Sequence, residues 1–140
     1  DLKAAEILPV LPSNIERDAL QKFSFVSPMA AVGACYEAPA AVMQEGGEKR
    51  ETFIELIKEI QKIASAMAVE LPENIVEINL QIMDDLAPTA SSSMQRDIAA
   101  GKQSEVDGLI YQVVRLGKQY QVDVPVYEEI GEKLRERLGN

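Results

Sequence analysis

The sequence predicts an all-α fold, a multi-helix bundle, on three observations. Residues that favour helices dominate the composition, whereas aromatic residues make up only 5% of it and Trp is absent. Apolar residues recur at intervals of three and four along most of the chain. Prolines and glycines separate the resulting segments. With 140 residues and 46% hydrophobic content, the chain can bury one core of ordinary size.

The first twelve residues are interpreted as a linker, and the helical domain is expected over residues 13–140. Pro9 and Pro12 prevent a helix from continuing through the linker. The chain begins with Asp rather than Met, and it carries no glycine-rich nucleotide-binding loop. We therefore expect it to be a piece of a longer protein.

The first helix is expected to begin after Ser13 or Asn14, either of which can cap it. Its apolar stripe consists of Ile15, Ala19, Phe23 and Val26. Pro28 is expected to kink or break this helix, so that residues 29–36 continue as a second, offset segment. Small residues in the second segment would allow close packing against a neighbouring helix. They are Ala30, Ala31, Gly33 and Ala34.

Two amphipathic helices are predicted in the middle of the chain. A helical turn at residues 39–44 and a loop at Gly46 and Gly47 precede a helix over residues 48–69. The apolar side of that helix consists of Phe53, Ile57, Ile60, Ala64 and Met67. The side assigned to solvent consists of Glu51, Glu55, Lys58, Glu59 and Lys62. The next helix begins at residues 71–74 and ends before Pro88. Its predicted buried side is Ile75, Ile78, Ile82, Met83 and Leu86.

Three more helices are expected in the last third of the chain. One of about two turns runs from Ser92 to near Gly101, and a longer one is capped by Ser104. The apolar stripe of the longer helix is Val106, Leu109, Ile110, Val113, Leu116 and Tyr120. Gly108 and Gly117 interrupt it at a cost of about 1 kcal/mol each, which indicates close packing or the approach of a ligand. The last helix begins at residues 123–126 and turns Val126, Ile130, Leu134 and Leu138 inward.

Composition excludes several classes of function. A net charge of -9 without a basic stripe argues against a nucleic-acid partner, since binding phosphates requires a positive surface. No apolar stretch approaches the roughly 20 residues that cross a bilayer, so no membrane association is expected. The single cysteine, Cys35, cannot form an intrachain disulfide, which fits a cytoplasmic protein. Because His is absent, a His general base and a His-ligated metal are excluded, and no metal site is expected.

Lys22 is the first candidate for chemistry. At helical spacing its neighbours include Ala19, Phe25 and Val26, so its ammonium is expected to be partly desolvated. Desolvation eases proton exchange between an amine and a substrate. The alternative is a surface lysine that pairs with Asp18 four residues earlier while its stem covers apolar surface.

The serine run at residues 91–93 is the second candidate. Ser92 and Gln95 have the spacing of a capping box, which places Ser93 in the first turn of a helix, near unpaired N–H groups that suit a carboxylate. The alternative is that these serines only cap the helix. A second capping box begins at Ser104, and Glu105 lies in its first turn, where the helix dipole favours a negative charge. Glu105 could also hydrogen-bond a sugar hydroxyl or a nearby lysine.

From about Asn14 to its end, the chain resembles the C-terminal domain of the ketopantoate reductase (2-dehydropantoate 2-reductase) family. Besides Lys22, the residues that carry the resemblance are Ser92-Ser-Met94, Asp97-Ile98, Ser104-Glu-Val-Asp107, Val113-Val-Arg-Leu-Gly117 and Val124-Pro-Val126. The resemblance implies a helical domain that closes the substrate cleft of an NADPH-dependent enzyme. It also implies a Rossmann-type N-terminal domain as the partner that holds the cofactor, and a 2-keto acid as the substrate. A homodimer is compatible with the resemblance.

The same resemblance implies roles for the candidate residues. Lys22 would protonate the carbonyl oxygen as hydride arrives, and Ser93, with Ser92 beside it, would bind the substrate carboxylate. Glu105 would reach the cofactor side of the cleft. Val26 and Ala90 depart from the family pattern, because both positions usually hold an asparagine that binds the substrate. Leu20 replaces a usual aromatic residue. The competing function is a non-catalytic helical module for dimerisation or binding, with the alanine-rich segment and the glycine-containing helix as its contact surfaces.

Overall fold

A computed structural model describes residues 17–91 and 107–137 of the chain. Within these ranges every regular element is a helix and no strand occurs, which confirms the all-α prediction. The elements are α1 (Arg17–Tyr36), α2 (Ala40–Gln44), α3 (Glu48–Ala66), α4 (Ile75–Asp85), the π-helix η1 (Asp107–Tyr111), α7 (Gln112–Tyr120) and α8 (Pro125–Arg137). None of these helices is long and apolar enough to span a membrane.

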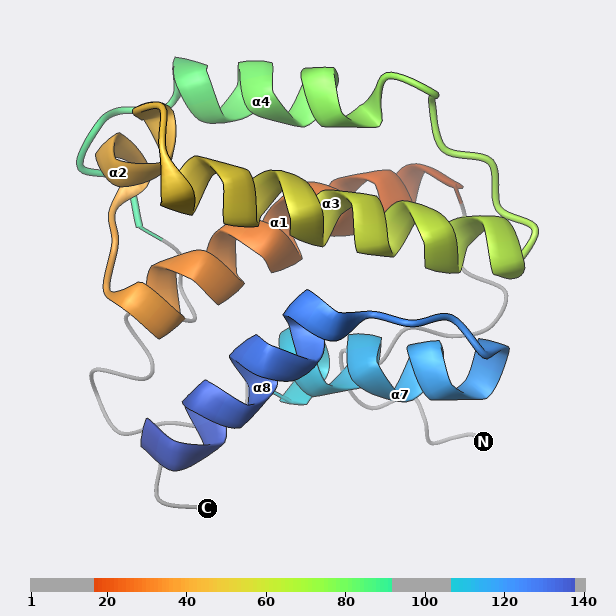
Figure 1. Cartoon of the computed structure of the whole chain (residues 1–140). Coiled ribbons are helices and arrows are strands. Elements are labelled where there is room, and N and C mark those ends of the chain that lie inside the picture. The colour runs from red at the N-terminus through yellow and green to blue at the C-terminus, as the bar shows by residue number, and fades with distance from the viewer. Residues whose placement is uncertain (1–16, 92–106, 138–140) are drawn as a thin grey trace.

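The helices form three layers around one core. In Figure 1, α1 and α3 cross in the middle, α4 lies along one side of them, and α7 and α8 cover the other side. Side chains from all three layers are fully buried in the core, among them Phe53, Ile57, Ile75, Tyr127 and Ile130. The two terminal nitrogens of the Arg50 guanidinium in α3 donate to the two carboxylate oxygens of Asp84 in α4, at 2.8 and 3.1 Å. This pair fixes the outer helix α4 to the central layer.

Of the two outcomes predicted for Pro28, a kink or a break, the break is wrong, because α1 continues through it to Tyr36. Proline has no N–H, so the carbonyl of Ser24, four residues earlier, loses its helical donor. The side-chain amide of Asn79 in α4 replaces it, donating to the Ser24 carbonyl at 3.2 Å and to the Ser24 hydroxyl at 3.1 Å. Asn79 is 1% exposed, so this substitute donor lies inside the protein. A neighbouring helix thus allows a proline in the middle of α1.

The buried face of α1 is turned relative to the predicted stripe. Leu20, Ser24 and Ser27 are buried, whereas Ala19 is exposed and Phe23 and Val26 are only half-buried. The predicted Ala30, Ala31, Gly33 and Ala34 are buried as expected, and α1 packs closely against α3. The N-terminal half of α1 therefore leaves part of its apolar surface uncovered within the described part of the chain.

Two residues in α3 and α4 also differ from their predicted environments. Glu59, assigned to the solvent face of its helix, is 3% exposed, and Ile82, assigned to the core, is 41% exposed. Ile78 and Leu86 are half-buried, whereas Ile75 and Met83 are buried as predicted. Helix α3 ends at Ala66 rather than at residue 69. The helix predicted from Ser92 to Gly101, the cap at Ser104, and the inward positions Val106 and Leu138 lie outside the described residues.

Gly117 confirms the close packing that its position in a helix predicts. A Cβ atom there would lie 2.9 Å from the Val122 carbonyl oxygen and 3.0 Å from Cγ2 of Val124. The Val122 N–H also donates to the Gly117 carbonyl at 2.8 Å, so the chain turns back tightly at this point. The backbone of the α7–α8 connection therefore occupies the space that a side chain would need.

We expect Gly117→Ala to lower the free energy of unfolding by about 1–3 kcal/mol, because the added methyl group overpacks this turn. Chemical denaturation measures the change. Gly131→Ala in α8 is the matched control, since its Cβ would meet the Tyr111 ring at 3.6 Å and Cγ2 of Ile110 at 4.0 Å, both ordinary contacts. The control should keep or gain up to about 1 kcal/mol through its higher helix propensity. Equal effects of the two substitutions would contradict the packing argument.

Candidate functional site

Lys22 lies beside a groove between α1 and α4. The groove has a volume of about 480 Å³, and its lining residues are Asp18, Gln21, Lys22, Phe25, Val26, Asn79 and Ile82. The Lys22 side chain is exposed, so the expected partial desolvation is not found in the described part of the chain. The alternative interpretation expects an ion pair between Lys22 and Asp18. Within the same ranges, this ion pair is not found either. The ammonium is thus accessible to a molecule that enters the groove.

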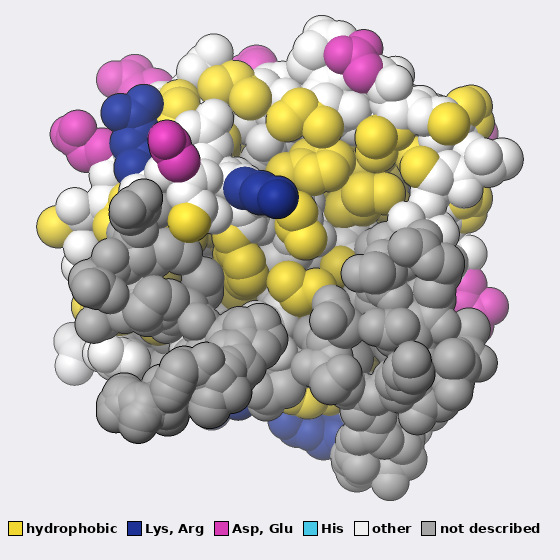
Figure 2. Space-filling view, turned by 180° about the vertical axis from the view of Figure 1, so that it is seen from behind, with side chains coloured by type: hydrophobic (Ala, Val, Ile, Leu, Met, Phe, Trp, Pro, Cys, Tyr) yellow, Lys and Arg dark blue, Asp and Glu magenta, His cyan; other side chains and the backbone are white. Residues whose placement is uncertain are grey.

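The groove is polar at one end and apolar at the other. Along α1, Asp18 and Gln21 come before Lys22, and Phe25 and Val26 follow it at three and four residues, on the same side of the helix. On the opposite wall, α4 contributes Ile82 to the apolar end. Figure 2 shows hydrophobic side chains gathered in the upper half of this face, where α1 and α4 lie. Lys22 therefore marks the border between a polar and an apolar surface.

Asn79 ties the two walls of the groove together. Its amide nitrogen makes the two hydrogen bonds to Ser24 described above, and the Ser24 hydroxyl donates to the Gln21 carbonyl. Ser24 follows Lys22 by two residues, so these bonds hold the turn of α1 that carries the lysine. Asn79 has no strong signal in the sequence, since it interrupts an apolar stripe in the way that a solvent-facing residue would.

A second polar network lies on the core side of α1. The hydroxyl of Ser27 donates to the Leu109 carbonyl in η1 at 2.6 Å, so its single proton is used there. The Tyr127 hydroxyl, 2.7 Å from the Ser27 oxygen, must then be the donor in that pair. Burial raises the pKa of Tyr127, which keeps the phenol neutral. This network joins α1, η1 and α8 next to Pro28.

Glu59 caps a helix that belongs to a different part of the chain. Its two carboxylate oxygens accept the N–H groups of Val126 at 2.9 Å and Tyr127 at 3.0 Å, in the first turn of α8. Burial raises the pKa of Glu59, and the two backbone hydrogen bonds act in the opposite direction. The first turn of α8 is thus bound from inside the protein and is not open to a ligand.

The residues predicted to bind substrate and cofactor, Ser92, Ser93 and Glu105, lie outside the described residues. The chain that leads to them is anchored at the start of α2. The Ala90 carbonyl accepts the Ala40 N–H at 2.9 Å, and the Pro88 carbonyl accepts the Ala41 N–H at 2.9 Å. Ala90 itself does not line the groove beside Lys22. Of the predicted site residues, the structure thus describes only Lys22, and it places Val26 in the same groove.

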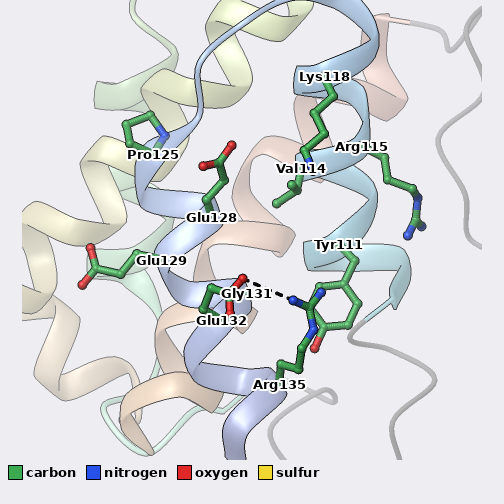
Figure 3. Close-up of a pocket in the computed structure, with 10 residues that line it drawn as sticks. All are labelled: Tyr111, Val114, Arg115, Lys118, Pro125, Glu128, Glu129, Gly131, Glu132 and Arg135. Atoms are coloured by element: carbon green, nitrogen blue, oxygen red, sulfur yellow. Dashed lines mark hydrogen bonds and ion pairs between the residues drawn. The ribbon is translucent and has the colours of Figure 1, made fainter. Parts of the chain in front are cut away.

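Another cavity of about 470 Å³ lies between the η1–α7 segment and α8. Figure 3 shows Arg135 of α8 alongside the ring of Tyr111, at 5.2 Å, and its ion pair with Glu132, at 3.2 Å. The cavity is lined by three cationic and three anionic side chains, namely Arg115, Lys118, Arg135, Glu128, Glu129 and Glu132. The formal charges of this lining therefore sum to zero. The groove beside Lys22 is taken as the candidate site, because it holds the one predicted site residue that the structure describes.

Two kinds of comparison place the chain among known sequences. A family model described as the C-terminal region of ketopantoate reductase PanE/ApbA matches residues 14–137. The chain is 30% identical over 132 residues to a 2-dehydropantoate 2-reductase from Pyrobaculum aerophilum, which covers 93% of this chain and 47% of the relative. It is 24% identical over 121 residues to an uncharacterised oxidoreductase, YkpB, from Bacillus subtilis, covering 86% of this chain and 40% of that protein.

Solved structures with lower identity have the same fold. A dimeric ketopantoate reductase from Staphylococcus aureus matches with a TM-score of 0.82 at 21% identity, over 92% of this chain and 45% of that protein. A D-mandelate dehydrogenase, solved with NADH and anilino(oxo)acetate, matches with a TM-score of 0.78 at 17% identity, over 88% of this chain and 41% of that protein. The chain thus spans less than half the length of each of these relatives. By the match over residues 14–137, it belongs to the family of ketopantoate reductase C-terminal domains.

Proposed function

We propose that this chain is the catalytic C-terminal domain of an NADPH-dependent oxidoreductase that reduces a 2-keto acid to a 2-hydroxy acid. Residues 13–140 would form the domain and residues 1–12 the linker to a Rossmann-type N-terminal domain. Family membership supports the reaction class, and coverage of less than half of the relatives' length leaves room for a dinucleotide-binding domain. In the family's own reaction, the substrate would be ketopantoate and the product pantoate. We place the protein in the cytoplasm, because its single cysteine fits a reducing compartment.

The exposed ammonium of Lys22, at the edge of the groove, is the observation that carries this proposal. During reduction, a new C–H bond forms at the carbonyl carbon and the C=O π bond breaks, which leaves negative charge on the oxygen. Lys22 would give one proton to that oxygen and so complete the hydroxyl group. Ser93, with Ser92 beside it, would hold the substrate carboxylate, and Glu105 would face the cofactor. NADPH supplies the hydride when it is bound.

The described residues fit a domain that contributes side chains to a cofactor site rather than a domain that binds the cofactor alone. Phosphates often bind at the N-termini of helices, where N–H groups are unpaired. In α2, the N–H groups of Ala40 and Ala41 are taken by the chain at residues 88–90, and in α8 the first turn is taken by Glu59. These two helix starts are therefore not available to a pyrophosphate, which supports a separate domain as the main cofactor site.

A non-catalytic dimerisation module is the competing function, and the buried state of its expected contact surface weighs against it. The small residues Ala30, Ala31, Gly33 and Ala34 pack inside this chain, and Gly117 packs against the connection to α8. They are thus not available to a partner. Because the S. aureus relative is dimeric, we expect the whole protein to form a homodimer through other surfaces.

Oxidation of NADPH by the intact protein, assayed against a small panel of 2-keto acids that includes ketopantoate, tests the proposal. We expect turnover with at least one member of the panel, and none by residues 1–140 alone, because the dinucleotide-binding domain would be missing. The isolated chain is the control for background reactions. If the intact protein neither binds NADPH nor reduces any member of the panel, the proposed function is wrong.

A further inference from the structure

We propose that the apolar end of the groove, formed by Phe25, Val26 and Ile82, receives the side chain of the 2-keto acid. That side chain would be a branched or aromatic hydrocarbon without a hydroxyl group. The inference rests on the proposed function, because it takes Lys22 as the group that meets the keto oxygen. It goes further by naming the class of substrate that this chain prefers.

The spacing of Lys22 and Val26 places the substrate side chain. Residues four apart on a helix are neighbours, about 5–6 Å apart at their Cβ atoms. In a 2-keto acid, the side chain begins at the carbonyl carbon, one bond from the oxygen that Lys22 would protonate. With its oxygen at Lys22, the molecule can direct its side chain along α1 toward Phe25 and Val26.

Three of the lining side chains, those at the apolar end, offer no hydrogen bond to a hydroxyl group. Phe25, Val26 and Ile82 carry only hydrocarbon side chains. Asn79 is the one side-chain amide on the α4 wall. Its nitrogen already donates to both the carbonyl and the hydroxyl of Ser24, so what it can still offer a ligand is its amide oxygen, as an acceptor. A substrate hydroxyl covered only by Phe25, Val26 and Ile82 would lose its bonds to water without replacement, which costs binding free energy.

Two further features of the apolar end suit a hydrocarbon ligand. One wall is supported by the core, and part of the apolar surface is exposed to water. The ring of Phe25 packs edge-on against the buried ring of Phe53, with centroids 5.9 Å apart, so the core holds it from behind. Ile82 is 41% exposed, whereas Ile75 and Met83 of the same helix are buried. A hydrocarbon side chain that covers Val26 and Ile82 would remove this apolar surface from water.

Two substrates that differ by one hydroxyl group test the inference directly. They are ketopantoate and 3,3-dimethyl-2-oxobutanoate, which lacks only the terminal hydroxyl, and the readout is kcat/KM of the intact protein for each. We expect kcat/KM to be at least ~10-fold higher for the compound without the hydroxyl, within the range that an apolar pocket achieves against an added hydroxyl. Val26→Asn should shift the ratio toward ketopantoate by about 10-fold, the effect of one new hydrogen bond.

Val114→Asn is the matched control, because Val114 is also half-buried on a helix but lies away from the groove. It should leave the substrate ratio unchanged. If Val26→Asn lowers the thermal midpoint so far that rates cannot be compared, Ile82→Ser at the exposed position replaces it and should also shift the ratio toward ketopantoate. A preference of the parent protein for ketopantoate, or a ratio that the groove variants and Val114→Asn change equally, would overturn the inference while the proposed function stands. Failure to reduce either compound, or any other 2-keto acid, would instead count against the proposed function.

Discussion

Replacing Lys22 with alanine is expected to lower kcat of the intact protein by at least ~100-fold, the scale of a general-acid contribution. The ammonium lies at the border of the groove between α1 and α4, and among the lining residues it is the one cation that could protonate a carbonyl oxygen. Without it, the negative charge that develops on that oxygen would have to be neutralised by water. NADPH-dependent turnover, measured at saturating substrate, gives the size of the effect.

One further variant separates the role of the proton from that of the positive charge, and a second serves as a control. Lys22→Arg keeps a positive charge but releases a proton very poorly, so it should retain much of the substrate binding and little of the turnover. Lys62→Ala, which removes an exposed lysine from α3, is the surface control and should leave kcat unchanged. Near-normal turnover by Lys22→Ala would remove Lys22 from the mechanism. High turnover by Lys22→Arg would reduce its role to that of a fixed charge.

The helices themselves could be predicted from the sequence because their signals are local. Apolar spacing and the breaks at Gly46, Gly47 and Pro88 depend on residues within a few turns of one another, and α2, α3 and α4 begin close to their predicted positions. The continuous α1 could not be predicted, since the donor that replaces the missing N–H of Pro28 comes from Asn79, in another helix. The predicted break followed the local rule, and the tertiary contact overrides it.

The candidate site could be predicted only in part, for a related reason. The residues around Lys22 identify it as a lysine on an apolar helix face, but apolar spacing alone does not tell whether that face meets the core or a ligand. In α1 the core takes Leu20, Ser24 and Ser27, which include two hydroxyl groups, and leaves Val26 half-buried at the groove. The hydroxyls are acceptable inside because each has a hydrogen-bond partner. Such pairing is set by the three-dimensional arrangement and is not visible in hydrophobic periodicity.

Glu59 is the clearest case of a charge whose role the sequence hides, and its removal should have the largest effect on stability. We expect Glu59→Ala to lower the free energy of unfolding by about 2–3 kcal/mol, because the N–H groups of Val126 and Tyr127 would be left unbonded in the interior. Glu55→Ala, one turn earlier on the exposed side of α3, is the control and should change stability by less than about 0.5 kcal/mol. Denaturant unfolding of the two variants gives the comparison, and similar losses would show that Glu59 does not cap α8 in solution.

The pH dependence of the Glu59→Gln variant tests the electrostatic part of the same argument. Burial, the largest cause, raises the pKa of Glu59 above its usual value of 4.5, so the folded protein holds this proton more tightly than the unfolded chain does. The stability that the carboxyl group contributes is therefore complete below the unfolded pKa and is lost as the pH rises through the folded pKa. Relative to the parent, Glu59→Gln should be most destabilised in acid, and the difference should shrink toward neutral pH. A difference that grows with pH would mean that the hydrogen bonds from Val126 and Tyr127 outweigh burial, so that Glu59 caps α8 as a full negative charge.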